Sequence, residues 1–127
     1  MIEQRDLPED VYAHGFNIPE GYRRVFEQGL TNLVPWYFVT GEEFHRLYKG
    51  LNSRYPQRLV LPFARRKDCD DVACFVVHSP DFSQGHVLII HDFASAGFEV
   101  DVGLNSFWDW FLLAVQEMIE CSKACAE

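Results

Sequence analysis

Two apolar segments separated by a charged turn constrain the fold of this chain more than any other feature. The first segment reads QRLVLPFARR (residues 57–66), the second reads VACFVV (residues 72–77), and KDCDD lies between them. Segments of this length, rich in β-branched and aromatic residues and joined by aspartates, are typical of a β-hairpin. The second segment is apolar on both faces of a strand, which predicts a central strand covered on each side.

Three further segments have the character of strands. They read VPWYFV (residues 34–39), GHVLII (85–90) and GFEVDVG (97–103). In the last of them apolar residues alternate with Glu99 and Asp101, so we expect Phe98 to face the core and the two acids to face solvent. The connections are short and favour antiparallel neighbours. We therefore expect a mainly antiparallel sheet of about four to six strands.

Apolar residues at helical spacing predict two helices in the first half of the chain. The segment PEGYRRVFEQGLTNL begins at Pro19, which is tolerated in a first helical turn, and we expect this helix to end at Gly29. The segment TGEEFHRLYKGL begins with Thr40 and carries Glu43 three residues later, which is a capping-box pattern. Residues 1–18 give no clear prediction.

An amphipathic C-terminal helix is predicted to begin at Ser106 and to lie across the sheet. Leu113 falls among the polar positions of this helix, so we expect it to be exposed and available for contact. The predicted buried face consists of Trp108, Phe111, Leu112, Val115, Met118 and Ile119. The chain as a whole, residues 1–127, is predicted to form one α+β domain.

The candidate metal ligands do not form a known pattern. Zinc sites pair closely spaced ligands, and the spacings in this chain match none of those arrangements: Cys69, Cys74, His78, His86 and His91. The aspartates of the turn lack the central glycine and distal glutamate of a calcium-binding loop. We therefore predict no metal and no cofactor.

Catalysis is not indicated either. Cys74, His91 and Asp92 have the residue types of a nucleophilic site, but His91 and Asp92 are adjacent on a strand end and should point in opposite directions. The sequence contains no nucleophile elbow and no glycine-rich phosphate loop. We predict that the protein is not an enzyme.

The charge of the chain bears on its partners. A formal net charge of −8 disfavours binding to nucleic acid and permits a basic protein partner. No apolar run reaches the roughly 20 residues that span a bilayer, and the start of the chain lacks the features of a signal peptide. We therefore expect no membrane association and a cytoplasmic location. The candidate partner-binding residues are Asp68, Asp70 and Asp71 in the turn, together with Trp110 and Leu113 on the last helix.

The order of four segments resembles bacterial members of the SUKH superfamily, which also includes a eukaryotic regulator of cell-wall synthesis. These segments are VPWYFVTGEEFHRLYKGLNSRYP, LPFARRKDCDDVACFVV, VLIIHDFASAGFEVD and FWDWFLLAVQEMIE. The resemblance covers roughly residues 19 to 121. The family pattern often has tryptophan before the glutamate where this chain has Phe98–Glu99, so a contact made by that tryptophan does not transfer directly.

The resemblance implies a single SUKH-like α+β domain without catalytic activity. It also implies an immunity protein that binds and neutralises a polymorphic toxin, often a nuclease. The acidic charge is compatible with a basic toxin groove. A regulatory or scaffolding domain that binds a cellular protein is the second hypothesis, and a small metal-dependent or cysteine enzyme is the third. A homodimer through an exposed edge strand also remains open.

Overall fold

The protein folds as an α+β domain around one antiparallel sheet. The computed structural model describes the backbone of residues 1–126 and the side chains of residues 1–124. Along this part of the chain the elements are η1 (Gln4–Asp6), α1 (Glu9–Ala13), α2 (Glu20–Glu27), β1 (Asn32–Leu33), β2 (Trp36–Phe38), α3 (Gly41–Arg54), β3 (Leu59–Arg66), β4 (Asp71–His78), β5 (Val87–His91), β6 (Val100–Leu104) and α4 (Phe107–Ala126). The predicted fold class is confirmed.

The sheet is a meander in which each strand pairs with its neighbours in the sequence. Its order within the described residues is β1-β2-β3-β4-β5-β6, and each adjacent pair is antiparallel. The predicted hairpin is formed by β3 and β4, with residues 67–70 in the turn. The interiors of β4 and β5 are buried on both faces, as the sequence predicted.

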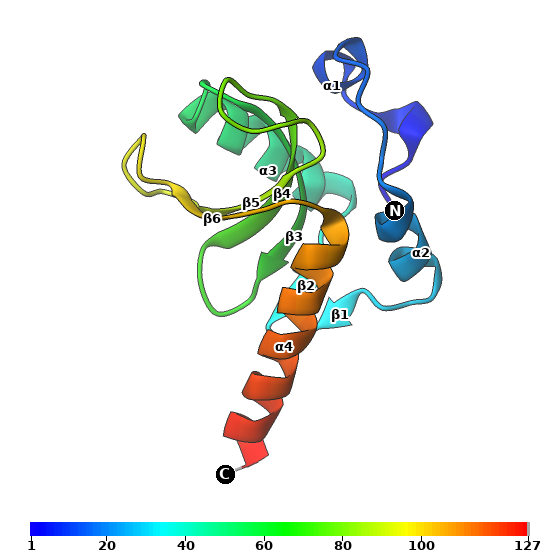
Figure 1. Ribbon diagram of the computed structural model, residues 1–127, viewed down its shortest axis with the longest axis vertical. Coiled ribbons are helices and arrows are strands. Elements are labelled where there is room, and N and C mark those ends of the chain that lie inside the picture. The colour runs from blue at the N-terminus through cyan, green and yellow to red at the C-terminus, as the bar shows by residue number, and fades with distance from the viewer. Residues whose placement is uncertain (127) are drawn as a thin grey trace.

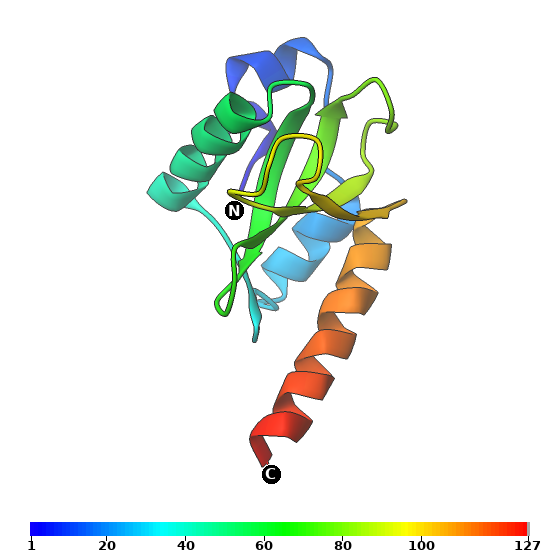
Figure 2. The same ribbon diagram turned by 90° about the vertical axis from the view of Figure 1, so that its left-hand side faces the viewer.

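Helices cover both faces of the sheet (Figure 2). On one face α3 packs against β3 and buries Phe44, Leu47 and Leu51. On the other face α2 and α4 cover a cluster of aromatic rings. Phe63 lies at its centre, with its ring centroid 4.2 Å from that of Phe75 and 4.9 Å from that of Trp110. The remaining rings of the cluster are Tyr22, Phe38 and Phe107.

The buried face of α4 is not the predicted one. The side chains that α4 buries completely are Phe107, Trp110 and Ala114, whereas Leu112 is 69% exposed. Most of the stripe that we expected against the sheet therefore points away from it. The prediction of Trp110 as an exposed contact is wrong, because Trp110 stacks edge-on against Trp36 inside the core. Leu113 is half-buried and packs against the core, so its expected exposure is only partial.

The N-terminal half differs from the predictions in two further places. The segment VPWYFV is not one strand, because Pro35 lies in a turn between β1 and β2. Residues 1–18, for which the sequence gave no prediction, form η1 and α1 and bury Val11 and Phe16. The amide of Ile2 donates a 3.0 Å hydrogen bond to the hydroxyl of Tyr22, which ties this segment to α2. No helix in residues 1–126 combines the length and apolarity needed to cross a bilayer.

Candidate protein-interaction surface

The loop between β5 and β6, residues 92–99, is held at both ends by a buried carboxylate. Asp92 at its start is 4% exposed and Glu99 at its end is 2% exposed. Arg54, from the last turn of α3, donates two hydrogen bonds to Asp92, of 2.8 and 2.6 Å. Arg58, just before β3, donates one of 3.0 Å to Glu99. Buried carboxylates are stable only when paired in this way, so the two arginines fix the ends of the loop.

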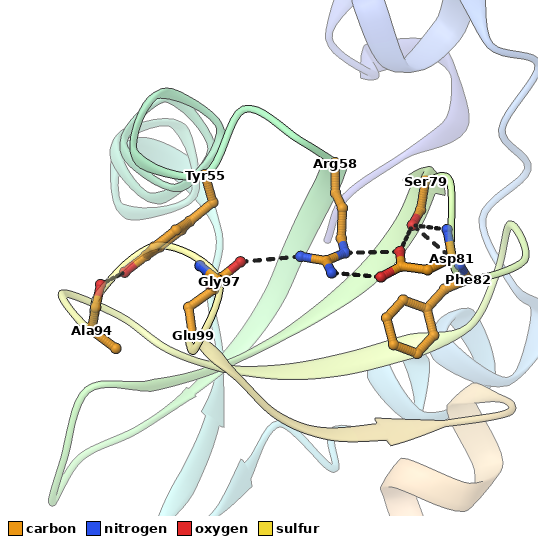
Figure 3. A network of polar contacts seen from close by, with 8 residues as sticks. All are labelled: Tyr55, Arg58, Ser79, Asp81, Phe82, Ala94, Gly97 and Glu99. Carbon is orange, nitrogen blue, oxygen red and sulfur yellow. Dashed lines mark hydrogen bonds and ion pairs between the residues drawn. The ribbon is translucent and has the colours of Figure 1, made fainter.

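Arg58 joins this loop to a second one, as Figure 3 shows. Its guanidinium donates to both carboxylate oxygens of Asp81, at 3.1 and 2.7 Å, while its third nitrogen reaches Glu99. The hydroxyl of Ser79 donates to Asp81 and accepts from the amide of Phe82. The hydrogen bond from Arg58 lowers the pKa of Asp81 to about 2, so this carboxylate is ionised at neutral pH. One arginine thus orders the β4–β5 and β5–β6 loops together.

The backbone of the β5–β6 loop is also constrained internally. Phe93 has φ +66°, a left-handed conformation that is uncommon for a bulky residue, and its amide donates to Asp92 at 2.9 Å. Its ring lies 4.4 Å from the Arg54 guanidinium carbon. The amide of Gly97 donates to Glu99 at 2.6 Å, and the hydroxyl of Tyr55 donates to the backbone of the same loop. A strained residue kept in place by several contacts is a feature of functional loops.

This rigid loop presents two phenylalanines to solvent. Phe93 is 71% exposed and Phe98 is 82% exposed. The predicted alternation is therefore reversed at this point, since Glu99 is buried and Phe98 is outside. The reversal follows from the partners available to Glu99: Arg58 and the Gly97 amide together offset the cost of burying its charge. Single exposed apolar residues are common on protein surfaces, but two on one fixed loop form a candidate contact site.

Acidic residues lie beside this loop. The amide of Asp92 donates a 3.1 Å hydrogen bond to the carbonyl of Asp70, which brings the β3–β4 turn against the start of the loop. Asp71 lies across from His91 in the sheet, and their side chains are 2.8 Å apart. The hydrogen bond with Asp71, and the charges of Asp71, Asp70 and Asp101, raise the pKa of His91. Figure 1 shows the β3–β4 turn and the β5–β6 loop on the same side of the ribbon.

We use the name aromatic–acidic surface for Phe93, Phe98, Asp70, Asp71 and Asp101. It includes two of the three aspartates that the sequence singled out. The third, Asp68, is exposed but points along the turn, where it accepts two 2.8 Å hydrogen bonds from Arg66. That pairing lowers the pKa of Asp68.

The other two predicted contact residues lie elsewhere. Arg66 also bonds Glu117, so the turn is connected to α4. Trp110 and Leu113 belong to α4 on the far side of the sheet core and do not approach the loop. The structure therefore does not bring the five predicted contact residues together.

The sequence reasoning missed both exposed phenylalanines. A signal for them was present in the loop sequence DFASAGFE. A pair of one acid and one phenylalanine stands at each end of it, and small residues lie between the two pairs. The second half of the signal is the pair of arginines at positions 54 and 58. Only the structure shows that each arginine reaches one of the two acids.

The candidate catalytic residues are not arranged as a catalytic site. Cys74 lies at the centre of the sheet, where burial raises the pKa of its thiol well above the usual value. A thiol held in its protonated form is a weak nucleophile. His91 and Asp92 point in opposite directions, as predicted, because His91 is exposed and Asp92 is buried. Within the described residues, no three histidine, cysteine or carboxylate side chains gather in a way that could hold a metal ion.

Comparisons with protein-family models, curated proteins and solved structures found no match for this chain. The SUKH-like assignment therefore stays a prediction from the sequence.

Proposed function

We propose that this chain is a non-enzymatic protein-binding domain that acts as an immunity protein, neutralising a toxin by binding it through the aromatic–acidic surface. The observation that carries the proposal is the β5–β6 loop, whose two buried carboxylates are paired with Arg54 and Arg58 while Phe93 and Phe98 stay exposed. A loop ordered before binding loses little conformational entropy when the partner arrives. The phenylalanines would supply apolar anchors, and the neighbouring carboxylates would supply long-range attraction.

The acidic residues specify the charge of the partner. Asp70 and Asp101 are exposed beside the loop, and the chain carries a formal net charge of −8. Such a surface attracts a basic partner and speeds its association, most strongly at low salt. A nuclease toxin, whose substrate groove must be basic to bind phosphates, has the matching chemistry. The SUKH resemblance points to the same class of partner.

The experiment takes as partner a candidate toxin domain from a gene that adjoins the gene for this chain. We expect the two proteins to form a one-to-one complex by isothermal titration calorimetry, and we expect the complex to lose toxin activity. The variant Phe93→Ser/Phe98→Ser should raise the Kd by about 100-fold or more, because exposed aromatic anchors dominate interface energy. Tyr12→Ser, which removes an exposed aromatic ring from α1, is the matched control and should leave the Kd unchanged.

A second pair of variants tests the electrostatic part. Asp70→Lys/Asp101→Lys should lower the association rate and remove most of its salt dependence. Glu9→Lys/Asp10→Lys changes the net charge equally on exposed positions of α1 and should have a much smaller effect. Binding that is indifferent to both the phenylalanine and the aspartate variants would refute this surface as the contact site. Binding without inhibition of the toxin would favour the regulatory or scaffolding hypothesis instead.

A further inference from the structure

The outward side of α4 carries an apolar stripe that the described part of the chain covers only in part, chiefly where the indole of Trp108 packs beside Gly21 of α2. Trp108, Leu112 and Ile119 are exposed and Val115 is half-buried. Their spacing alternates between four and three residues, which places them along one side of a helix. That side is opposite to the one on which Trp110 enters the core. This helix is therefore apolar on two sides, and the sheet uses only one of them.

The shape of the molecule makes the second side accessible. Figures 1 and 2 show that the distal half of α4 runs beyond the sheet, away from α1 and α3. Near the point where α4 leaves the sheet, Glu117 accepts a 3.2 Å hydrogen bond from the indole of Trp36 and forms an ion pair with Arg66. Ile119 lies beyond these anchors and is exposed. A projecting helix with an apolar stripe is typical of an interface rather than of a solvated surface.

The residues beside the stripe indicate what covers it. Asp109, Gln116 and Lys123 follow one another at seven-residue intervals, so they lie along one flank of the stripe, and all three are exposed. The flank is acidic near the start of the helix and basic near its end, and in its middle Gln116 donates a 3.1 Å hydrogen bond to Glu120 on the same flank. It is complementary to itself when a second copy runs in the opposite direction. Asp109 of each helix then faces Lys123 of the other, and Gln116 faces its counterpart.

We propose that α4 is a dimerisation surface on which a second copy of this chain docks as an antiparallel helix pair centred near Gln116. Val115 packs close to the two-fold axis, and on either side of it Leu112 of one copy packs against Ile119 of the other. Because only the N-terminal half of each α4 packs against its own sheet, the two sheets lie at opposite ends of the pair. The projecting half of each helix is then covered by the sheet-proximal half of the other.

A parallel pair does not use this complementarity, since its two-fold axis runs along the helices and places the flank of each copy on opposite faces of the pair, where Asp109 and Lys123 do not meet. The antiparallel pair also leaves the aromatic–acidic surface open, because the β5–β6 loop and α4 project in different directions (Figure 1). Dimerisation is therefore independent of the proposed function and does not compete with it.

Sedimentation equilibrium of the purified chain over a wide range of concentrations tests the proposal. We expect a monomer–dimer equilibrium. Leu112→Glu/Ile119→Glu should raise the dimer Kd by at least ~100-fold, because it places charges at the centre of the interface. Phe93→Glu/Phe98→Glu makes the same change in apolar area and charge on the aromatic–acidic surface and should leave the dimer Kd unchanged. Circular dichroism confirms that each variant is folded.

A charge exchange tests the direction of the helices. Asp109→Lys and Lys123→Asp should each weaken the dimer by roughly tenfold, since each puts like charges together at both ends of the pair. The double variant Asp109→Lys/Lys123→Asp should restore the dimer to within a few-fold of the original. A chain that is monomeric at every concentration overturns the proposal. So does a dimer that survives Leu112→Glu/Ile119→Glu, or a double variant that fails to recover.

Discussion

Removal of the Glu99 carboxylate should destabilise the fold much more than removal of Asp81, although both acids bind the same arginine. Glu99 is almost fully buried and accepts two hydrogen bonds, of 3.0 Å from Arg58 and 2.6 Å from the Gly97 amide. Hydrogen bonds that involve a charged group contribute about 1.5–3 kcal/mol each. In the Glu99→Ala variant Arg58 retains its ion pair with Asp81, so the charge of the guanidinium still has a partner. We therefore expect a loss of about 3 kcal/mol, which for a domain of this size lowers the Tm by roughly 10 °C.

The comparison variant is Asp81→Ala. Asp81 accepts two hydrogen bonds from Arg58, of 3.1 and 2.7 Å, whereas Glu99 accepts only one from this arginine. The Arg58–Asp81 pair therefore has the better hydrogen-bond geometry. Its side chain is nevertheless 48% exposed, and water competes for both groups. Exposed ion pairs contribute about 1 kcal/mol or less, so we expect a loss in that range.

Urea unfolding at neutral pH measures both free energies of unfolding directly. We expect burial, and not hydrogen-bond geometry, to decide how much each carboxylate contributes to the free energy of unfolding. Equal losses for the two variants would refute it, and so would a larger loss for Asp81→Ala. A second consequence concerns the loop: proteolysis at residues 92–99 should become faster in Glu99→Ala and stay slow in Asp81→Ala.

Three further predictions concern packing, a buried hydrogen bond and pH. Gly21→Ala should cost about 1–3 kcal/mol in urea unfolding and shift the tryptophan fluorescence, because the new Cβ would lie 2.8 Å from an indole carbon of Trp108. Tyr22→Phe should cost about 1–2 kcal/mol, since it leaves the buried amide of Ile2 without its acceptor. His91→Gln should lower the Tm at pH 5.5 but not at pH 8.5. The pKa of His91 is raised in the folded state, so its stabilising effect is present below its unfolded pKa and is lost as pH rises through its folded pKa. A Tm difference that grows toward high pH would contradict this sign.

The antiparallel pairing and the central hairpin were predictable because local signals and burial agree there. The apolar residues of β3 and β4 are strand formers, and the aspartates between them favour a turn whatever packs against the sheet. The end of α2 was predictable for a similar reason. Gly29 follows that helix with φ +76°, a conformation that glycine adopts without strain.

The orientation of α4 could not be predicted, because its sequence offers two apolar faces. Trp108, Leu112 and Ile119 form one, while Phe107 and Trp110 begin the other. Periodicity alone cannot choose between them. The choice depends on the aromatic cluster of the sheet, where Phe107 and Trp110 fit between rings contributed by strands far away in the sequence.

The candidate site was only half predictable, for a different reason. The acidic turn is a local feature, so Asp70 and Asp71 were found. The position of Phe98 depends on where Glu99 finds a partner, and that partner is Arg58, 41 residues earlier in the chain. A long-range ion pair overrides the alternation of a strand and leaves no local trace in the sequence.

The meander order of the sheet has a consequence for how the chain forms during synthesis. Each strand pairs with the one made just before it, and short loops close these pairs except between β2 and β3, where α3 intervenes. The bond between Trp36 and Glu117, by contrast, joins residues 81 positions apart. Until α4 emerges from the ribosome, Phe63 and Phe75 have no Trp110 to cover them. A nascent chain that ends near residue 105 should therefore hold a nearly complete sheet whose aromatic face is covered by α2 alone, and it is in that interval that a chaperone would find its best binding site.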